Sequence, residues 1–503
     1  MMYVRGSTAD YDDWATLGED QSWSAAKLAP YFRKHQTLDP IDPSIKEQGF
    51  MPFVEAFHGT EGPIHTSFNE WRVPFEDPFM RACDEVAGMK QRPKDPWSGD
   101  HIGFYSSLSA VDRTNQKGTR SYAASGYLAP NLGRPNLKVL TEALACNVIL
   151  KDDTAMGVKF RHGGSTHEVH AKREIIVSAG AYQTPQILEL SGIGDPDVLK
   201  AAGIECLIAN PGVGANFQDH AVCVTLYELS DGHTSLDSLN KPELQEQLLK
   251  LYTETQAGAL AATSCCMGFL PYSSLVSSSE LEQTCASIAQ TPNQTPFQKL
   301  QYDQIITHLK SPISGNLQLV LVPATFDLDA GYTDQSKLFG GPKTGRDSVT
   351  IAICLQYPAS RGTIHITSSD PLTQPAIDPA FLTHPADVAV LAAGLEFCQR
   401  VAEAPHLTSQ IAGRLIPEPE VNLFDREEAA KATRERVVTE YHPCGSCAMG
   451  EVVDGRLRVK GIKGLRVVDA SIFPNHVSGN IMSSVYAVAE KAADMIKEDS
   501  AEY

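Results

Sequence analysis

The C-terminal half of the chain carries hydrophobic patterns that predict strands and one long helix. Apolar and β-branched runs predict strands over residues 317–322, 348–353 and 362–367. The last run alternates between apolar and polar residues, which is typical of an antiparallel sheet with one face in water. Residues 386–403 carry apolar side chains at helical spacing, which predicts an amphipathic helix.

Two other regions lack such strand patterns. Residues 20–97 predict helices and loops. Residues 226–300 are rich in Ser, Gln, Thr and Leu and predict helices with a mobile loop near residues 274–279. Between these two regions, residues 134–141 differ, because they predict a loop that enters a strand.

Two short apolar runs predict buried strands. Residues 173–177 end in a β-branched run, Ile175-Ile176-Val177, without a polar break, which is typical of a strand covered on both faces, and a helix pattern follows through residue 188. Residues 465–469 form a second short strand, and apolar residues at helical spacing follow between 485 and 496. Because ligands of open α/β sheets lie outside the carboxyl ends of strands, the residues after the first run are candidates for a binding site.

Size and charge limit the function classes. The chain has 503 residues, of which 42% are hydrophobic and 20% charged, so two or three globular domains are expected. The net charge is −19 and no basic stripe is present to hold phosphates, so nucleic acid is not an expected partner. No apolar run approaches the ~18 residues that a membrane span needs.

The cysteines and the N-terminus indicate neither a disulfide framework nor a leader. The odd count of 11 scattered cysteines argues against a disulfide scaffold. Cys444 and Cys447 form one isolated C-x-x-C pair, for which we expect packed or partly exposed thiols and no metal site. Met1 is not followed by a basic and then an apolar stretch. This favours a cytoplasmic location, while the sequon at Asn293 leaves secretion open.

The stretch from 440 to 496 combines chemically active residues with a predicted helix start. It contains Tyr441-His442-Pro443-Cys444-Gly445-Ser446-Cys447 and, after the strand, Ser478-Gly479-Asn480-Ile481-Met482. Ser478 can cap free N–H groups, and Gly479 lets a ligand approach the backbone. A helix N-terminus favours an anion, and a two-electron-reduced flavin is such an anion.

These residues resemble the C-terminal signature, H-x-x-G-[ST]-C, of the glucose–methanol–choline (GMC) family of FAD-dependent oxidoreductases. The resemblance implies that His442 is the catalytic base, and an imidazole suits that task near neutral pH. It also implies that Asn480 binds the substrate oxygen or orients His442. Without the motif, one histidine among 15 would be assigned to packing a turn. Asn480 is also suited to capping the helix.

The resemblance extends over nearly the whole chain and includes segments that we expect to be structural. Residues 58–63, 118–128, 211–220 and 358–379 look like further elements of the family. Within them we expect His58 to pack a loop and His220 to fix a turn.

The resemblance implies FAD as the cofactor and names the residues around it. Residues 178–194 are similar to the second signature of the family, and the strand end near 469 and the helix start near 481 are its other flavin contacts. From the residues alone, Asp469 could simply form a turn and Met482 could pack in the core. The implied cofactor-binding residues are Ala145, Ser178, Ala179, Gly180, Asp469, Ala470, Ile481 and Met482.

The start of the chain departs from the family pattern. Residues 1–14 resemble a segment that family members carry after the strand–glycine-loop–helix for the ADP half of FAD. No G-x-G-x-x-G is present, and in the nearest match Phe217 stands where the third glycine should be. We therefore expect the N-terminal ADP-binding βαβ segment to be missing. Lost upstream exons are the favoured explanation; a truncation that binds no FAD and a second polypeptide that supplies the segment remain open.

The resemblance implies an α/β plus α+β fold. A split, Rossmann-like FAD-binding domain, incomplete at its N-terminus, is expected over residues 1–219 and 439–503. A substrate-binding domain with an antiparallel sheet is expected over residues 220–438.

The expected reaction is the FAD-dependent oxidation of an alcohol to an aldehyde or ketone. We expect an apolar or aromatic alcohol as the substrate and oxygen or a quinone as the electron acceptor. Two alternatives stay open: a hydroxynitrile-lyase-like enzyme without redox chemistry, and a non-catalytic remnant or binding subunit of the same fold.

Overall fold

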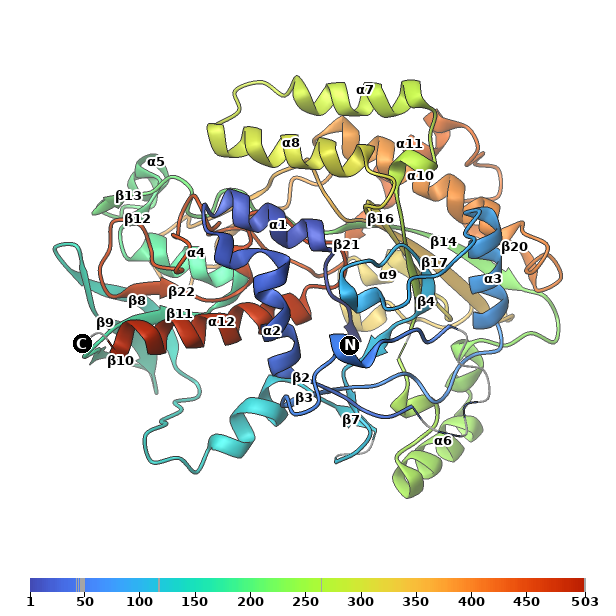
Figure 1. Ribbon diagram of the computed structural model, residues 1–503, viewed down its shortest axis with the longest axis horizontal. Helices are drawn as coiled ribbons and strands as arrows, with labels where there is room; N and C mark the ends of the chain where they lie inside the picture. Colours follow the sequence, from blue (N-terminus) through green and yellow to red (C-terminus); the bar gives the residue numbers. More distant parts are fainter. Residues whose placement is uncertain (42, 44, 46–49, 116–117, 264, 502–503) are drawn as a thin grey trace.

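A large antiparallel sheet organises one side of the computed structural model, which describes residues 1–41, 43, 45, 50–115, 118–263 and 265–501. Within these residues the sheet has seven strands, in the order β20-β14-β17-β16-β15-β4 with β21 paired to β14 (Figure 1). Their bounds are β4 (Gly103–Ser106), β14 (Ala221–Leu229), β15 (Cys266–Leu270), β16 (Leu317–Val322), β17 (Ser348–Leu355), β20 (Ile411–Ile416) and β21 (Val438–Thr439).

This sheet is buried because helix α10 (Pro385–Ala402) packs across β14, β16 and β17. Helices α3 (Glu76–Val86), α7 (Ser278–Ala289) and α11 (Arg426–Arg436) contact α10 from outside. Every residue of β17 is buried, so this strand is a central element of the hydrophobic core.

The strands predicted at 317–322 and 348–353 correspond to β16 and β17, and the helix predicted at 386–403 is α10. The third predicted strand lies elsewhere. As β18 (Thr363–His365) it pairs with β19 (Ala376–Asp378) in a two-stranded antiparallel sheet of its own. Its alternating pattern therefore indicated the pairing type but not the partner.

A parallel pair of strands lies at the opposite side of the molecule. β11 (Ile175–Val177) pairs with β22 (Leu465–Val467), and α4 (Gly180–Leu190) follows β11. The prediction that this run is covered on both faces is wrong for Ile176, which is 42% exposed while Ile175 and Val177 are buried. A continuous apolar run cannot show which of the two faces of a strand the tertiary structure covers.

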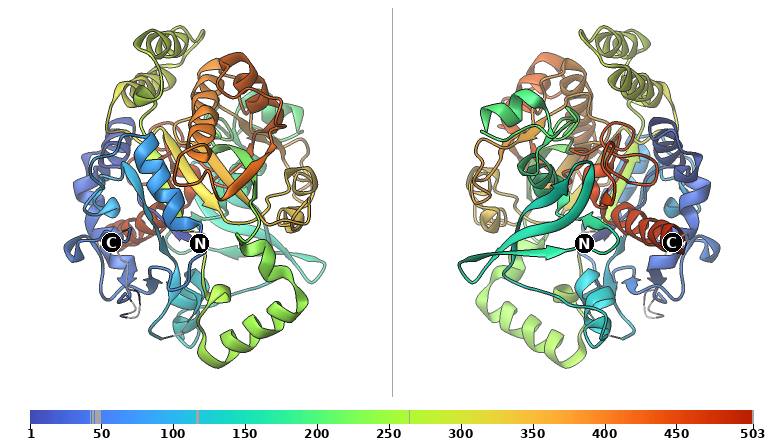
Figure 2. Two further views of the ribbon diagram at one scale, coloured as in Figure 1. Left: turned by 90° about the vertical axis from the view of Figure 1, so that its right-hand side faces the viewer. Right: turned by 90° about the vertical axis from the view of Figure 1, so that its left-hand side faces the viewer.

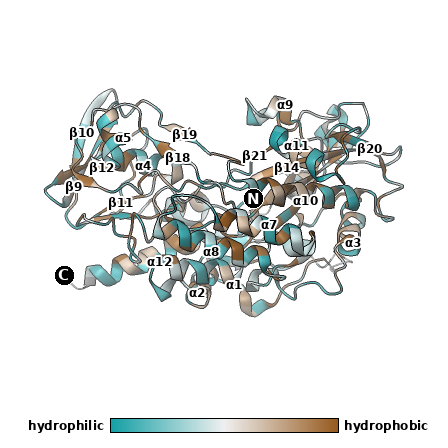
Figure 3. Cartoon of the chain, turned by 90° about the horizontal axis from the view of Figure 1, so that it is seen from above, coloured by the Kyte–Doolittle hydropathy of each residue, from teal (hydrophilic) through white to brown (hydrophobic). Residues whose placement is uncertain are grey.

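Helix α12 (Met482–Ala501) lies beside this pair and packs on α2 (Ala25–His35), which in turn contacts α1 (Thr8–Leu17). The helix predicted at 485–496 therefore begins at Met482, two residues after Asn480. In Figure 3, helices such as α8 and α12 carry both hydrophobic and hydrophilic segments, as expected for helices with one buried face.

A three-stranded antiparallel sheet extends along the edge of the molecule, where Figure 2 shows it in teal. It consists of β8 (Leu144–Lys151), β9 (Thr154–His162) and β10 (Ser165–His170). The loop predicted at 134–141 enters this sheet at β8. The stretch predicted as a loop near 274–279 ends where α7 begins at Ser278.

The remaining elements are short strands and peripheral helices. The helices are α5 (Pro196–Ala201), α6 (Pro242–Thr255), α8 (Pro296–Lys310) and α9 (Leu328–Gly331). The strands are β1 (Met2–Tyr3), β2 (Gln36–Leu38), β3 (Ile64–Thr66), β5 (Leu108–Ser109), β6 (Val111–Asp112), β7 (Thr119–Arg120), β12 (Ile193–Gly194) and β13 (Ile208–Ala209). None of the helices in the described part of the chain combines the length and apolar character that a bilayer crossing requires.

The predicted division into residues 1–219 plus 439–503 and residues 220–438 stays a prediction. Most strands of the large sheet fall within the second interval. β4 and β21 lie wholly or partly outside it, since β4 at Gly103–Ser106 pairs with β15.

The packing of α10 on the sheet makes a testable stability prediction. A Cβ added at Gly394 would lie 2.5 Å from Ile353 Cγ1, so Gly394→Leu should lower the free energy of unfolding by about 1–3 kcal/mol through overpacking. Denaturant unfolding measures this loss. Gly413→Leu is the control because a Cβ there meets no atom within 4 Å; equal losses in both variants would contradict the packing.

Candidate active site

His442 lies in a loop after β21 that is fixed against a distant part of the chain. Its backbone N–H donates to Asp219 Oδ1 at 2.9 Å. Gln218 and Cys444 exchange backbone hydrogen bonds of 3.0 and 2.9 Å. The motif that begins at His442 is therefore positioned by the segment just before β14.

The side chains of His442 and Asn480 are in contact. Asn480 Nδ2 lies 3.0 Å from His442 Nε2, and Gln318 Nε2, on β16, lies 3.3 Å from Asn480 Oδ1. The His442 ring is nearly buried, with 8% of the residue exposed. The two residues predicted as catalytic thus form one unit, with a third residue from the large sheet.

The turn before α12 is held by side chains from two other elements. Ser478 donates its backbone N–H and its hydroxyl to Asp10 Oδ2, at 2.8 and 2.6 Å. The Gly479 N–H donates to Oε1 of Gln356, which is the residue that follows β17. The Ser478 hydroxyl, predicted to cap the helix, instead bonds to Asp10 of α1, whose role the sequence did not indicate.

Two further groups lie against the other edge of the His442 ring. His220 Nδ1 is 3.0 Å from His442 Nδ1, and Glu440 Oε2 is 3.5 Å from His220 Nδ1 and 3.6 Å from His442 Nδ1. His220 was expected only to fix a turn, and Glu440 was not singled out. Tertiary structure brings these two residues together, because β14 pairs with β21 and the backbone N–H of Glu440 donates to the His220 carbonyl oxygen. No local sequence pattern indicates this contact.

The cluster combines buried imidazole rings with one carboxylate, that of Glu440. Burial lowers the pKa of His220 below its ordinary value. Burial and two neighbouring histidines lower the pKa of His476 well below it, and that ring stacks on His220 with a centroid distance of 3.5 Å. Burial alone would raise the pKa of Glu440, but the adjacent His442 and His220 rings outweigh burial and hold it below its usual range. Glu440 is therefore a carboxylate at neutral pH.

The strand-end residues predicted to bind the cofactor meet at one point. Asp469, at the end of β22, accepts the backbone N–H of Gly180 at 2.9 Å and the hydroxyl of Thr184 at 2.6 Å. It also accepts the Ser471 N–H at 2.8 Å, which agrees with the alternative prediction that Asp469 forms a turn. These bonds join residues 178–180 to residues 469–470.

Asn480, Ile481 and Met482 lie at the start of α12, whereas Ala145 lies in a different part of the fold. Residues 471–479 are buried throughout, whereas Asn480, Ile481 and Met482 are partly exposed. Ala145 is exposed on β8, in the three-stranded sheet. The structure therefore groups the predicted residues at the strand ends, at the helix start beside His442, and at one separate position.

The other residues considered for chemistry are packed. His58 Nε2 bonds to Asp95 Oδ2 at 2.9 Å, and both side chains are only 1% exposed, in keeping with a structural role. Cys444 and Cys447 are buried free thiols, and burial raises their pKa well above the ordinary value.

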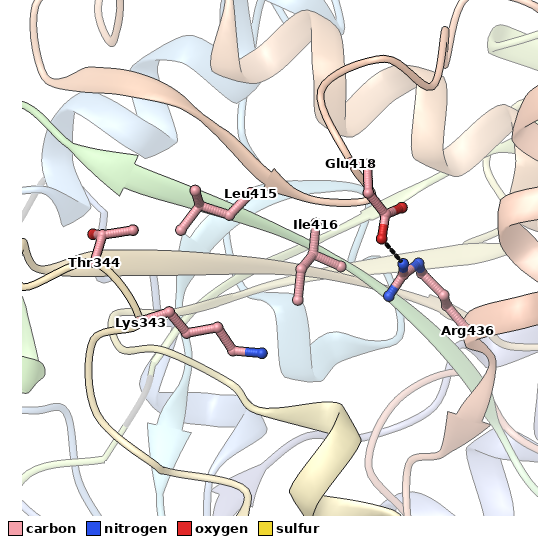
Figure 4. A pocket seen from close by; sticks show the side chains of 6 residues that line it. All are labelled: Lys343, Thr344, Leu415, Ile416, Glu418 and Arg436. Carbon is pink, nitrogen blue, oxygen red and sulfur yellow. Dashed lines mark hydrogen bonds and ion pairs between the residues drawn. The ribbon is translucent and has the colours of Figure 1, made fainter.

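Two surface hollows are lined in part by residues of β20 and β21, two strands of the large sheet. One, of about 250 Å³, is lined by Thr439 and Tyr441, which shortly precede His442 in the chain, and by a mainly apolar set. That set is Phe326, Leu328, Gly331, Tyr332, Leu338, Phe381, Val437 and Val438. The other, of about 410 Å³, is shown in Figure 4, where Glu418 and Arg436 form an ion pair of 2.5 Å. None of the predicted site residues is among the residues that line either hollow.

Comparison with known proteins gives consistent results. Family models described as GMC oxidoreductase match residues 1–222 and 358–489. Dehydrogenase mpl7 of Monascus purpureus is 44% identical over 99% of this chain and 82% of its own length. An FAD-dependent oxidoreductase from Chaetomium thermophilum is similar in structure, with a TM-score of 0.88 at 28% identity over 99% of this chain and 84% of that one. A fungal aryl-alcohol oxidase shares the fold, with a TM-score of 0.86 at 24% identity over 99% of this chain and 84% of that one.

These matches indicate FAD as the cofactor, and the residues present fit it. The partly exposed residues 480–482 interrupt a buried stretch where the N-terminus of a 20-residue helix offers backbone donors to an anionic group. The predicted absence of an N-terminal ADP-binding segment is not confirmed, because the N-terminal family model matches from residue 1.

The turn that carries Asn480 is sensitive to an added methyl group. Gly479 has φ +95°, and a Cβ there would lie 2.5 Å from Val4 Cγ1. Gly479→Ala should therefore lower the free energy of unfolding, measured in denaturant, by about 1–3 kcal/mol more than Gly232→Ala. The control shares the backbone strain, since Gly232 has φ +88°, but meets no atom within 4 Å. Identical losses would show that the turn is not tightly packed.

Proposed function

The chain belongs to the GMC oxidoreductase family, and on this premise we propose that it oxidises an alcohol to an aldehyde or ketone with His442 as the base. The contact between His442 Nε2 and the Asn480 amide carries the proposal. FAD supplies the acceptor for the hydride that leaves the alcohol carbon. Residues 178–180, Asp469, Ala470, Ile481 and Met482 would hold it.

The hydrogen bonds around Asn480 set the state of His442. Because Gln318 Nε2 donates to Asn480 Oδ1, the other end of that amide, Nδ2, faces His442 and donates to Nε2. Gln318 is oriented in the same way, since Gln356 Nε2 lies 3.5 Å from its Oε1. His442 Nε2 is therefore an unprotonated acceptor, which is the form that can take the proton of a substrate hydroxyl.

Asn480 has a different task from His442. An amide cannot accept a proton at neutral pH, so a single base acts here. When a substrate hydroxyl approaches Nε2, the Asn480 Nδ2 donor can bind the substrate oxygen and hold it next to the ring. The low exposure of His442 keeps competing water from this position.

The hollow of about 250 Å³ beside Tyr441 supports an apolar or aromatic alcohol as the substrate. Most of the side chains that line it are aliphatic or aromatic, and apolar walls with few polar groups are typical of sites for such ligands. We propose oxygen or a quinone as the electron acceptor.

Replacement of the base tests the proposal. In FAD-loaded protein, His442→Ala should lower the rate constant of flavin reduction by a benzylic alcohol by about 10²–10⁴-fold, because general base catalysis is lost. Stopped-flow absorbance of the flavin band measures the rate. His406→Ala, at a half-exposed ring that pairs with Glu85, is the control and should match the unchanged protein. Undiminished reduction in His442→Ala would refute the assignment.

A further inference from the structure

His220 and Glu440 lie on the side of His442 away from Asn480, where they decide which nitrogen carries the proton. The two Nδ1 atoms are 3.0 Å apart, so one proton lies between them. His220 Nε2 is 3.1 Å from the Val477 carbonyl oxygen, and a carbonyl only accepts, so His220 carries its proton on Nε2. A neutral His220 then has a bare Nδ1, and the shared proton belongs to His442 Nδ1.

A proton on His442 Nδ1 agrees with the unprotonated Nε2 that faces Asn480. Hydrogen bonds run in one direction from the Gly479 N–H through Gln356, Gln318 and Asn480 to His442. They continue through His220 to the Val477 carbonyl. Because both ends are backbone groups that cannot reverse, the tautomer of His442 is fixed by the fold.

Acceptance of a substrate proton places a positive charge on a nearly buried ring, which is unfavourable without a counter-charge. Glu440 Oε2 is 3.6 Å from His442 Nδ1. This oxygen is buried and has no hydrogen-bond partner among the described residues. Its charge therefore faces the two imidazole rings.

The other titratable groups around His442 do not fill this role. Asp219 accepts the backbone N–H of His442, and burial raises its pKa. His476 donates from its ring to the His442 carbonyl at 3.0 Å. Burial and the nearby Glu440 raise the pKa of the Cys354 thiol well above its ordinary value. The remaining neighbours, Tyr441 and Cys444, are neutral at pH 7.

We propose that Glu440 is a positioning residue that, with His220, keeps the proton of His442 on Nδ1 and balances the charge when Nε2 takes a proton. The inference rests on the proposed function. In the proton-transfer step the substrate O–H bond breaks, the His442 Nε2–H bond forms, and Glu440 remains ionised throughout. Glu440 therefore acts through His442 and does not touch the substrate.

Glu440→Gln tests this role, because it removes the charge and keeps the shape. In FAD-loaded protein the rate constant of flavin reduction should fall about tenfold or more. The acid limb of its pH profile should move to lower pH by about one unit, because a neutral amide no longer favours the protonated ring. Glu440→Asp should restore part of the rate and the position of the acid limb. Glu420→Gln, at an exposed position, is the matched charge control.

A second readout does not depend on turnover. Nitrogen-15 spectra of histidine-labelled holoenzyme report the tautomer and titration of each ring, and the His442 signals are identified by their loss in His442→Asn. The Glu440→Gln spectra should show the His442 titration midpoint moved to lower pH relative to the unchanged chain. An unmoved midpoint together with an unmoved acid limb would overturn the proposal for Glu440. If no alcohol reduces the flavin but the midpoint still moves, the proposed function fails while the role of Glu440 stands.

Discussion

The orientation of one imidazole is the constraint on which the rest of the site depends. His442 can act as a base only if Nε2 is bare and aimed at the accessible start of α12. Three side-chain amides impose this orientation from one side, and His220 imposes it from the other. Gln318, Gln356 and His220 are buried, and a buried polar group left unpaired costs about 1–3 kcal/mol. The directional chain therefore stabilises the fold and sets the chemistry by the same bonds.

The large antiparallel sheet explains why these groups meet. Gln318 lies on β16, Gln356 follows β17, and His220 precedes β14, and these three strands are neighbours. Their pairing places three polar residues at one end of these strands, next to the turn that starts α12. Packing of α10 on the other face keeps the strands in register, so hydrophobic burial far from the site sustains the geometry of the site.

The sequence predicted the parts of this site that local pattern or motif can carry. The strands at β16 and β17, helix α10 and helix α12 follow from residue spacing, and the pair His442 and Asn480 follows from resemblance. The groups it missed are those placed by tertiary pairing: Glu440 opposite His220, and Asp10 beneath Ser478. The exposed Ile176 shows the same limit, because composition describes a strand but not what covers it.

The contrast between the rings and the carboxylate around His442 has a physical logic. Burial keeps His220 and His476 neutral, so they contribute shape and hydrogen bonds and would not repel the positive charge that the proposed reaction places on His442. Glu440 is ionised in the same surroundings because the His442 and His220 rings outweigh the effect of burial on its pKa, and a carboxylate in water would be screened and weaker. In the proposed reaction, the site would separate two tasks. Neutral histidines fix the direction of the proton, and one buried carboxylate supplies the opposing charge.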